Sequence, residues 1–187
     1  GSLPATRILV LFAHPAFERS RVHRRLAAAA RAQQGVTFHD LYEAYPDFDV
    51  DVRREQELLL AHDLIVLQHP LYWYTAPALM KLWFEKVLTP GWAYGPGGDA
   101  LRGKRCLWVV TTGGDERDYS PWGLHLEPFA AFMPVVRQTA QFCGMQWLDP
   151  IVVHDAHRVD ADRLEAFGAR YREALIALNA EDVDRHA

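Results

Sequence analysis

Short apolar runs alternate with longer amphipathic stretches along this chain, and the alternation restricts the possible folds more than any other feature. Runs rich in Ile, Leu and Val predict buried strands at residues 7–13, 36–41, 64–68, 105–111 and 151–153. The spacing of apolar residues predicts helices at residues 20–33, 53–62, 76–88, 126–142 and 160–178. We therefore expect an α/β protein, a three-layer sandwich around a five-stranded parallel sheet of order 2-1-3-4-5.

Turn-forming residues set the expected boundaries of these elements. Ser20 is the expected N-cap of the first helix, and Pro134 should kink the fourth helix. His69-Pro70 should break the third strand, while residues 89–104, rich in glycine and proline, should form a loop.

No linker or internal repeat divides the sequence. Residues 7–187 are therefore expected to form a single domain. Gly1-Ser2 resembles a cloning remnant, and residues 1–6 are expected to be a disordered N-terminus.

Charge and composition exclude several classes of partner. Lys and Arg number 20 against 24 Asp and Glu, which gives a formal net charge of −4 without a basic stripe for nucleic acid. No apolar run is long enough to span a bilayer and no signal peptide precedes the first strand, so we expect a cytoplasmic protein. Cys106 and Cys143 lie in apolar surroundings and are expected to be buried free thiols.

Three unusual segments follow the first, third and fourth predicted strands. In open α/β sheets ligands bind beyond the carboxyl ends of the strands, near the point where the strand order reverses. With order 2-1-3-4-5, residues 14–23, 69–75 and 112–125 meet at that edge. The sequence therefore predicts a ligand site there.

The first segment leads from a strand into a helix and could hold a phosphate group. Free N–H groups and the positive end of the helix attract anions, and nearby hydroxyl, guanidinium and imidazole groups add donors. A plain capped helix with solvated arginines is the alternative. The candidate residues are His14, Ser20, Arg21, Val22 and His23.

The second segment carries three consecutive aromatic residues. Alternate side chains of an extended chain point to opposite faces, so three in a row are hard to bury, whereas a planar ring ligand would use them well. An aromatic contact between subunits is the alternative. The candidate residues are Pro70, Leu71, Tyr72, Trp73 and Tyr74.

The third segment combines paired glycines with a tyrosine and a histidine. Gly113 and Gly114 would let the backbone approach a ligand closely, after Thr111 and Thr112 at the end of the strand. A flavin that accepts hydride becomes anionic along one edge and needs donors there, which Tyr119 and His125 could supply. A surface tyrosine and histidine on a loop is the alternative.

These motifs in this order resemble the NAD(P)H:quinone oxidoreductase, or DT-diaphorase, family. PLYWY precedes a helix, TTGG follows a strand, and Tyr119 and His125 come at the family's spacing. The stretch from HDLYEAYPDFDV to PLYWY and the later GWAYGPGG are more similar still to the ancillary oxidoreductases of glutathione-gated potassium-efflux systems. The resemblance covers residues 7–178.

The resemblance implies a flavodoxin-like homodimer that holds FMN or FAD without a covalent bond. It assigns His14 and residues 20–23 to the flavin phosphate, and residues 71–74 and 111–114 to the isoalloxazine ring. Tyr119 and His125 match the pair that balances charge on the reduced flavin. His23 departs from the Asn usual in the ancillary proteins, which puts the phosphate contacts there in question. FMN is preferred because the short chain leaves little sequence for an adenosine.

The expected function is two-electron, ping-pong hydride transfer from NAD(P)H through the flavin to a quinone. One alternative is a regulatory subunit of a potassium-efflux transporter that uses the flavin site mainly as a sensor, which would place it at the inner membrane. A one-electron carrier fits poorly, because such carriers usually have an acidic surface and a threonine-rich phosphate loop.

A homodimer is also expected from the helix at residues 76–88. Its apolar residues surround more than the single stripe needed to cover a sheet, which predicts a second buried face on the order of 2,000 Å² or more. The alternative is that residues 90–104 fold back over that face.

Two weaker patterns carry no prediction. G-x-x-x-x-G-K at residues 98–104 runs into a strand, the reverse of a phosphate loop's context. His154 and His157 lack the further ligands of a metal site, so no metal is expected.

Overall fold

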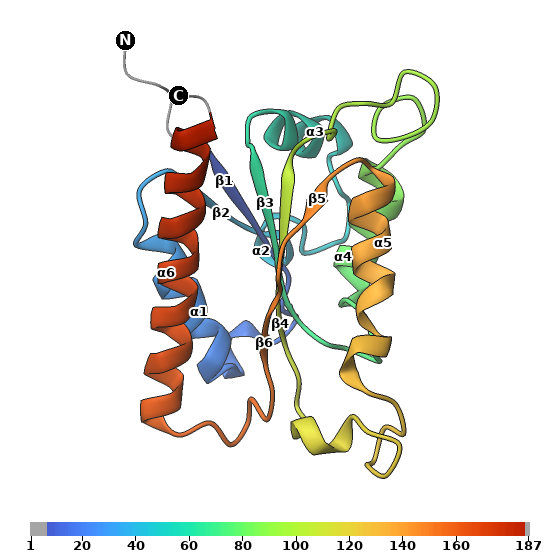
Figure 1. The fold of residues 1–187 in the computed structure, drawn as a ribbon. Coiled ribbons are helices and arrows are strands. Elements are labelled where there is room, and N and C mark those ends of the chain that lie inside the picture. The colour runs from blue at the N-terminus through green and yellow to red at the C-terminus, as the bar shows by residue number, and fades with distance from the viewer. Residues whose placement is uncertain (1–6, 186–187) are drawn as a thin grey trace.

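A parallel sheet lies at the centre of the fold (Figure 1). The computed structural model describes residues 7–185 and the side chains of residues 7–180, so the expected N-terminal remnant at residues 1–6 lies outside the described residues. The strands are β1 (Ile8–Phe12), β2 (Val36–Asp40), β3 (Leu64–Pro70), β4 (Arg105–Thr111), β5 (Gln146–Trp147) and β6 (Ile151–Val153). Their order is β2-β1-β3-β4-β5, and β6 also pairs with β4. The predicted flavodoxin-like order is confirmed.

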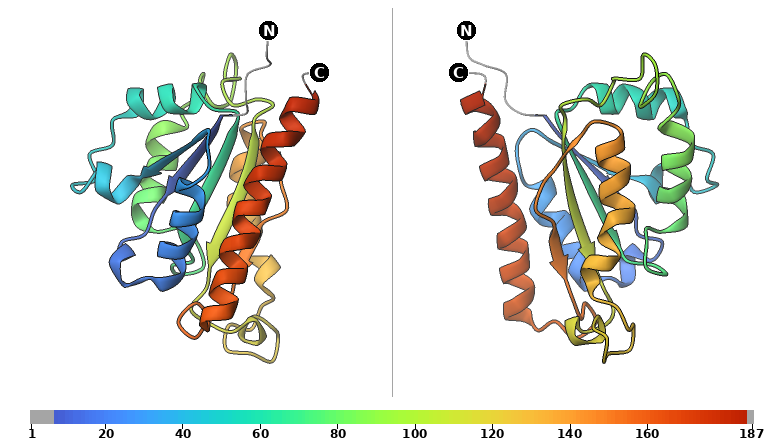
Figure 2. Two further views of the ribbon diagram at one scale, coloured as in Figure 1. Left: turned by 90° about the vertical axis from the view of Figure 1, so that its left-hand side faces the viewer. Right: turned by 45° about the vertical axis from the view of Figure 1, so that its right-hand side comes forward.

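Helices cover both faces of the sheet (Figures 1 and 2). α1 and α6 lie on one face, and α3, α4 and α5 lie on the other, with the short α2 following β2. The α-helices are α1 (Arg21–Arg31), α2 (Leu41–Ala44), α3 (Val52–Leu60), α4 (Ala78–Val87), α5 (Met133–Phe142) and α6 (Ala161–Arg185). Single 3-10 turns are η1 (Phe17–Arg19), η2 (Glu116–Asp118) and η3 (Phe129–Ala131).

The central strands are buried along their whole length, which explains their largely apolar sequence. Every residue of β1, β3 and β4 is buried, as expected for parallel strands covered on both faces. Alternate residues enter two separate cores, so that Leu9 and Leu11 face α3, α4 and α5 while Val10 and Phe12 face α1 and α6. The edge strand β2 is only partly buried.

Close packing of α1 against α6 fixes the position of the α1 N-terminus. Arg25 on α1 forms a two-pronged ion pair with Glu165, with Nε–Oε1 and Nη2–Oε2 distances of 3.0 and 3.1 Å. Gly168 leaves room for this guanidinium, because a β-carbon there would collide with it. The N-terminal turn of α1 is therefore held against the rest of the protein.

The structure corrects one predicted strand boundary and adds one strand. β3 continues through His69 and Pro70, which pair with Val110 and Thr111 of β4, so His69-Pro70 does not break the strand. The predicted fifth strand at residues 151–153 is β6, which pairs with the end of β4, while the two-residue strand β5, which pairs with the start of β4, was not predicted.

Helix boundaries also differ from the prediction. The helix expected at residues 126–142 begins only at Met133, and Pro134 lies in its first turn, where it does not kink the helix. The last helix extends beyond Leu178 to Arg185. Ser20 caps α1 as predicted, because its Oγ accepts a hydrogen bond from the His23 N–H at 3.1 Å.

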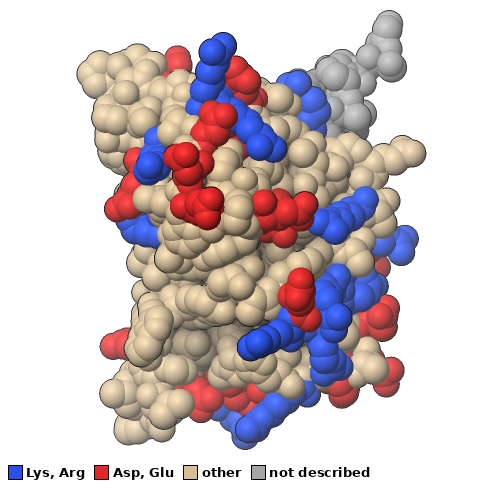
Figure 3. Space-filling view, turned by 180° about the vertical axis from the view of Figure 1, so that it is seen from behind, with Lys and Arg blue, Asp and Glu red and all other residues tan. Residues whose placement is uncertain are grey.

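The surface carries both signs of charge. Acidic and basic side chains are interspersed over the face shown in Figure 3, in keeping with the small formal net charge of −4. None of the helices in the described part of the chain combines the length and the apolar character that a bilayer crossing requires.

Candidate functional site

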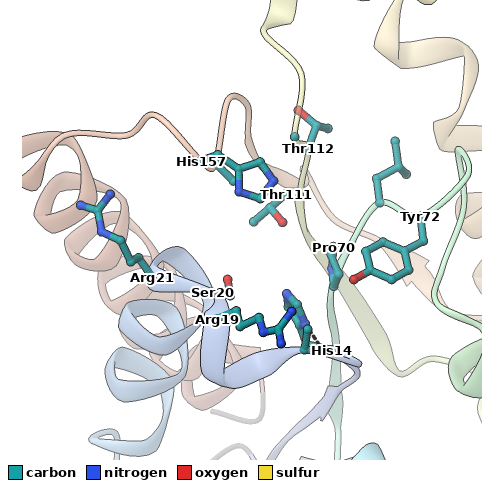
Figure 4. A pocket seen from close by; sticks show the side chains of 13 residues that line it. His14, Arg19, Ser20, Arg21, Pro70, Tyr72, Thr111, Thr112 and His157 are labelled. Carbon is teal, nitrogen blue, oxygen red and sulfur yellow. Dashed lines mark hydrogen bonds between the residues drawn. The ribbon is translucent and has the colours of Figure 1, made fainter.

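A cavity of about 480 Å³ opens beyond the carboxyl ends of β1, β3 and β4 (Figure 4). This volume falls within the range typical of small-molecule sites. Most of the lining comes from the three segments that the sequence singled out. The predicted site residues that line the cavity are His14, Ser20, Arg21, Pro70, Leu71, Tyr72, Thr111, Thr112 and Gly113.

The N-terminus of α1 forms one wall of the cavity. The first N–H groups of a helix have no carbonyl partner within it, and together with the helix dipole they attract an anion. Ser20 and Arg21 line the cavity at this point, and the side chain of Arg19 extends toward His14 in Figure 4. This wall is suited to a phosphate group.

His14 contributes a neutral donor to the same wall. Its Nδ1 accepts a hydrogen bond from the Ala16 N–H at 2.9 Å, which leaves the ring proton on Nε2. Burial, with a smaller effect from His157, lowers the pKa of His14 to about 4. His14 is therefore a neutral hydrogen-bond donor at neutral pH.

A tight turn after β3 separates the three consecutive aromatic residues. Tyr72 and Thr75 exchange two backbone hydrogen bonds of 2.8 and 3.0 Å, and the two residues between them have left-handed φ values, 47° at Trp73 and 66° at Tyr74. Tyr72 lines the cavity, with its ring edge-on to His14 at a centroid distance of 6.3 Å. Trp73 is 91% exposed. The turn therefore sends the three rings in different directions.

Tyr74 turns away from the cavity lining toward the segment after β4. Its hydroxyl lies 3.0 Å from Nδ1 of His125, and its ring stacks on Phe132 at 4.9 Å. Tyr74 thereby connects two of the three predicted segments within one chain.

Tyr119 and His125 form a cluster with Gly114, next to the Gly113 that lines the cavity. The rings of Tyr119 and His125 have their centroids 4.5 Å apart, and burial raises the pKa of the Tyr119 phenol. A β-carbon at Gly114 would lie 3.3 Å from His125 Nε2, so this imidazole packs directly against the glycine. The structure brings the predicted pair together beside the cavity, although neither side chain lines it.

The Thr112 hydroxyl holds the glycine segment in place. It donates to the Gly114 carbonyl at 2.8 Å, so it must accept from the His154 ring, whose Nδ1 is also 2.8 Å away. Thr112 thus orders the backbone between the cavity and the cluster of Tyr119 and His125.

Val22 and His23 point into the protein and do not line the cavity. Each side chain is 1% exposed. Only the backbone of Val22 could meet a ligand, as an N–H in the first turn of α1, whereas His23 contacts Thr111 from behind with 2.8 Å between Nε2 and Oγ1.

The cavity also has lining residues that the sequence did not single out. Ala156 and His157 come from the loop after β6, and a β-carbon at Gly113 would lie 3.5 Å from the His157 ring. The order of the strands could have indicated these residues, because β6 pairs with the end of β4 and the loop after β6 therefore lies at the same edge of the sheet. Among the described residues, no three His, Cys, Asp or Glu side chains gather as metal ligands would.

A family model described as a flavodoxin-like fold matches residues 6–175. The chain belongs to this flavodoxin-like family. The cavity lies at the carboxyl edge of the sheet, which is where open α/β folds bind their ligands.

Curated relatives of this flavodoxin-like protein include ancillary proteins of potassium-efflux systems. The glutathione-regulated potassium-efflux system ancillary protein KefF of Salmonella typhi is 44% identical over 170 residues, which cover 91% of this chain and 96% of the relative. The Klebsiella aerogenes protein of the same name is 44% identical over 173 residues, covering 90% and 94%.

Two solved structures are similar over nearly the whole chain. The general stress protein 14 of Treponema denticola, in complex with FMN, is 35% identical with a TM-score of 0.85, covering 92% of this chain and 99% of that one. An NADPH-quinone reductase from P. pentosaceus is 31% identical with a TM-score of 0.81, covering 90% and 97%.

Proposed function

We propose that the protein is an FMN-dependent NAD(P)H:quinone oxidoreductase. The observation that carries the proposal is the cavity itself, which joins a helix N-terminus, an aromatic ring and a close-approach glycine at one edge of the sheet. Relatives that are named as an FMN complex and as an NADPH-quinone reductase support it. When bound, FMN would accept hydride from NAD(P)H and pass two electrons to a quinone in a ping-pong cycle.

The cavity residues fit the parts of such a cofactor. The N–H groups at the start of α1, together with Arg19 and Arg21, would bind the phosphate, and His14 Nε2–H would add a neutral donor. Gly113 lines the cavity without a side chain, so a flat ring could approach its backbone beside His157, with Tyr72 in contact from the β3 side. FAD remains the second cofactor to test, since the phosphate-binding wall would accept either.

Tyr119 and His125 would balance negative charge at the ring edge. The Tyr119 phenol can donate a hydrogen bond at neutral pH, and burial raises its pKa further above the ordinary value. The Tyr74 hydroxyl can donate to a neutral His125 Nδ1 and can equally accept from a protonated one, because a hydroxyl does both. His125 could therefore take up a proton at Nδ1 without leaving its position.

A homodimer is part of the proposal, on a different argument from the sequence-based one. Phe84 and Leu88 of the α4 region line a small space together with Leu101 of the same chain, so residues 90–104 cover part of the surplus apolar surface. The most exposed large apolar side chains of the described residues lie instead in the segments after β3 and β4. They are Trp73 at 91%, Trp122 at 94%, Leu124 at 77% and Leu126 at 67% exposure. A second copy of the chain is the proposed cover.

The similarity to KefF motivates a second candidate, a cytoplasmic regulatory subunit that binds a potassium-efflux transporter at the inner membrane and uses the flavin site mainly as a sensor. The two candidates share the flavin site and differ in turnover. A sensor would bind flavin but oxidise NAD(P)H with quinone no faster than free flavin does.

The decisive experiment is cofactor binding followed by turnover. Purified protein freed of ligand should retain FMN on gel filtration, quench its fluorescence and then catalyse quinone-dependent oxidation of NADH or NADPH. Failure to retain either FMN or FAD at micromolar concentration would overturn the proposal. Retention without turnover would favour the regulatory candidate.

A further inference from the structure

A buried row of four polar side chains crosses the core and ends at the cavity. Tyr171 on α6 hydrogen-bonds Gln68 on β3 with 3.0 Å between the hydroxyl and Oε1. Gln68 Nε2 lies 3.3 Å from His23 Nδ1 on α1, and His23 Nε2 lies 2.8 Å from Thr111 Oγ1 on β4. Tyr171 and Gln68 are fully buried, His23 is 1% exposed, and Thr111 lines the cavity.

We infer that this row makes the Thr111 hydroxyl a directed hydrogen-bond donor to the bound cofactor, with His23, Gln68 and Tyr171 as positioning residues. The inference rests on the proposed function for the identity of the ligand. The direction of the hydrogen bonds rests on the geometry and burial of the row and does not depend on the ligand.

Each hydrogen bond in the row fixes the direction of the next. The Gln68 amide nitrogen can only donate, so His23 Nδ1 must accept, and the single proton of a neutral imidazole then sits on Nε2. His23 is neutral because burial, with smaller effects from His14 and His69, lowers its pKa well below the ordinary value. Its Nε2–H must therefore donate to Thr111, and the Thr111 proton remains free.

The opposite direction is disfavoured at the Tyr171 end. Flipping the Gln68 amide would reverse every bond in the row, so that Thr111 donated to His23 and Tyr171 accepted from the amide. The Tyr171 proton would then be buried without an acceptor, because among the described residues Tyr171 has no hydrogen bond other than that to Gln68. A buried donor without a partner costs about 1–3 kcal/mol. The observed direction moves the unused donor out of the core and into the cavity.

A donor at Thr111 suits a cofactor that presents acceptor atoms. Phosphate oxygens, ring carbonyls and unprotonated ring nitrogens accept hydrogen bonds, and at Thr111 they would meet an O–H that has no competing acceptor in the row. The residue at position 23 matters here because an imidazole, with one donor and one acceptor nitrogen, transmits the direction from Gln68 on β3 to Thr111 on β4.

The first test determines the direction of the hydrogen bonds in the row, using protein without bound cofactor. The ¹⁵N spectrum of histidine-labelled protein should show His23 with Nδ1 unprotonated and Nε2 protonated near neutral pH. Tyr171→Phe removes the group that sets the direction, so the Nδ1–H form should become populated in that variant. A wild-type His23 protonated on Nδ1, or a tautomer unchanged by Tyr171→Phe, would overturn the inference.

The second test measures FMN affinity in a double-mutant cycle. Thr111→Val should weaken FMN binding about three- to tenfold, the range for one neutral hydrogen bond, and Thr111→Ser should restore it. Tyr171→Phe should weaken binding in the wild-type background but not in the Thr111→Val background. Equal effects of Tyr171→Phe in both backgrounds would show that it acts through general stability, against the inference. If wild-type protein binds no flavin, the proposed function fails, while the histidine spectrum still decides the direction of the row.

Discussion

The Tyr74 hydroxyl lies 3.0 Å from Nδ1 of His125, and this contact joins the turn after β3 to the segment after β4. The Tyr74 ring also stacks on Phe132, just before α5. His125 is therefore held from two sides, by Tyr74 at Nδ1 and by Gly114 next to Nε2. A residue that seemed suited to stack on a ligand instead orients the histidine that would balance the ligand's charge.

Tyr74→Phe should slow flavin reduction without loss of flavin. The ring and its stacking on Phe132 remain, and only the hydrogen bond to His125 disappears. We expect reduction by NAD(P)H to slow by about three- to tenfold, in line with the loss of one hydrogen bond, as measured by stopped-flow absorbance. Tyr94→Phe is the matched control, since it also removes one hydroxyl but its ring packs against Phe142, away from the residues that line the cavity. Equal rates in the Tyr74 variant and the wild type would contradict this role.

Tyr119→Phe and His125→Gln should each leave flavin bound and slow its reduction more strongly. Proton donation and charge balance by positioned groups contribute about 10²-fold or more. Because the two rings pack together at 4.5 Å, the double variant should lose less than the product of the single effects. Single-turnover reduction rates at several NAD(P)H concentrations separate this step from coenzyme binding. Wild-type rates in both single variants would remove the pair from the mechanism.

Adjacent glycines provide a matched pair of substitutions. A β-carbon at Gly114 would lie 3.2 Å from Asp118 Oδ2 and 3.3 Å from His125 Nε2, tighter than ordinary contacts, so Gly114→Ala should displace His125 and slow flavin reduction. At Gly113 the nearest atoms belong to His157 at 3.5 Å, an ordinary contact. Gly113→Ala should therefore leave the His125 ¹⁵N signals unchanged and act mainly on flavin affinity. The opposite pattern would place the charge-balancing group elsewhere.

Buried histidines should make the fold less stable in mild acid. His69 accepts from the Trp108 indole at Nε2 and donates from Nδ1 to the Pro70 carbonyl, both at 2.8 Å, and burial lowers its pKa to about 4. Between about pH 6.5 and pH 4 the unfolded chain takes up a proton that the folded protein excludes. The unfolding free energy therefore falls as the pH decreases through this window, by up to about 1.4 kcal/mol per pH unit for this residue.

Glutamine can reproduce both hydrogen bonds of His69 but does not titrate. His69→Gln should accordingly show a shallower loss of stability between pH 6.5 and pH 5, a range above the ordinary carboxyl pKa values. Urea unfolding monitored by tryptophan fluorescence gives the comparison. Parallel curves for the two proteins would mean that His69 does not contribute to the acid sensitivity.

The proposed dimer depends on exposed apolar residues in the segments after β3 and β4. Light scattering at low micromolar concentration should report about twice the mass of 21.3 kDa. Trp122→Glu should shift the protein toward monomer, since Trp122 is 94% exposed and a charge there would be buried by a partner. Leu60→Glu, on α3 and half-exposed, is the control that should leave the mass unchanged. A wild-type monomer that still turns over quinone would show that one chain holds a complete site.

The order of the sheet followed from the sequence because its central strands are buried on both faces and contain short apolar runs that alternate with helices. β5 escaped notice because it has only two residues, Gln146 and Trp147, too few for any periodicity. The start of α5 was misplaced for a different reason. Pro134 is compatible with either a kink or a first turn, and the sequence did not show that residues before Met133 leave the helix.

The candidate site was found through topology, whereas side-chain directions lay beyond the sequence. Apolar and aromatic residues at a strand end predict a site, but the left-handed turn at Trp73 and Tyr74 decides which ring faces the cavity. His23 shows the same limit. Its position at the start of α1 suggested a phosphate contact, yet helix geometry turns its side chain inward to Gln68 and Thr111.

The turn between Tyr72 and Thr75 has a backbone conformation that costs stability, but it carries aromatic side chains beside the site. Left-handed backbone costs a residue with a β-carbon about 1–2 kcal/mol, and here two aromatic residues in succession adopt it. Glycine at either position would relieve that cost and remove the ring. Trp73 is exposed, so a selection for heat resistance alone should enrich glycine at position 73. At position 74 glycine would also remove the stacking on Phe132 and the contact with His125, so Tyr74 should persist under selection for stability and for turnover alike.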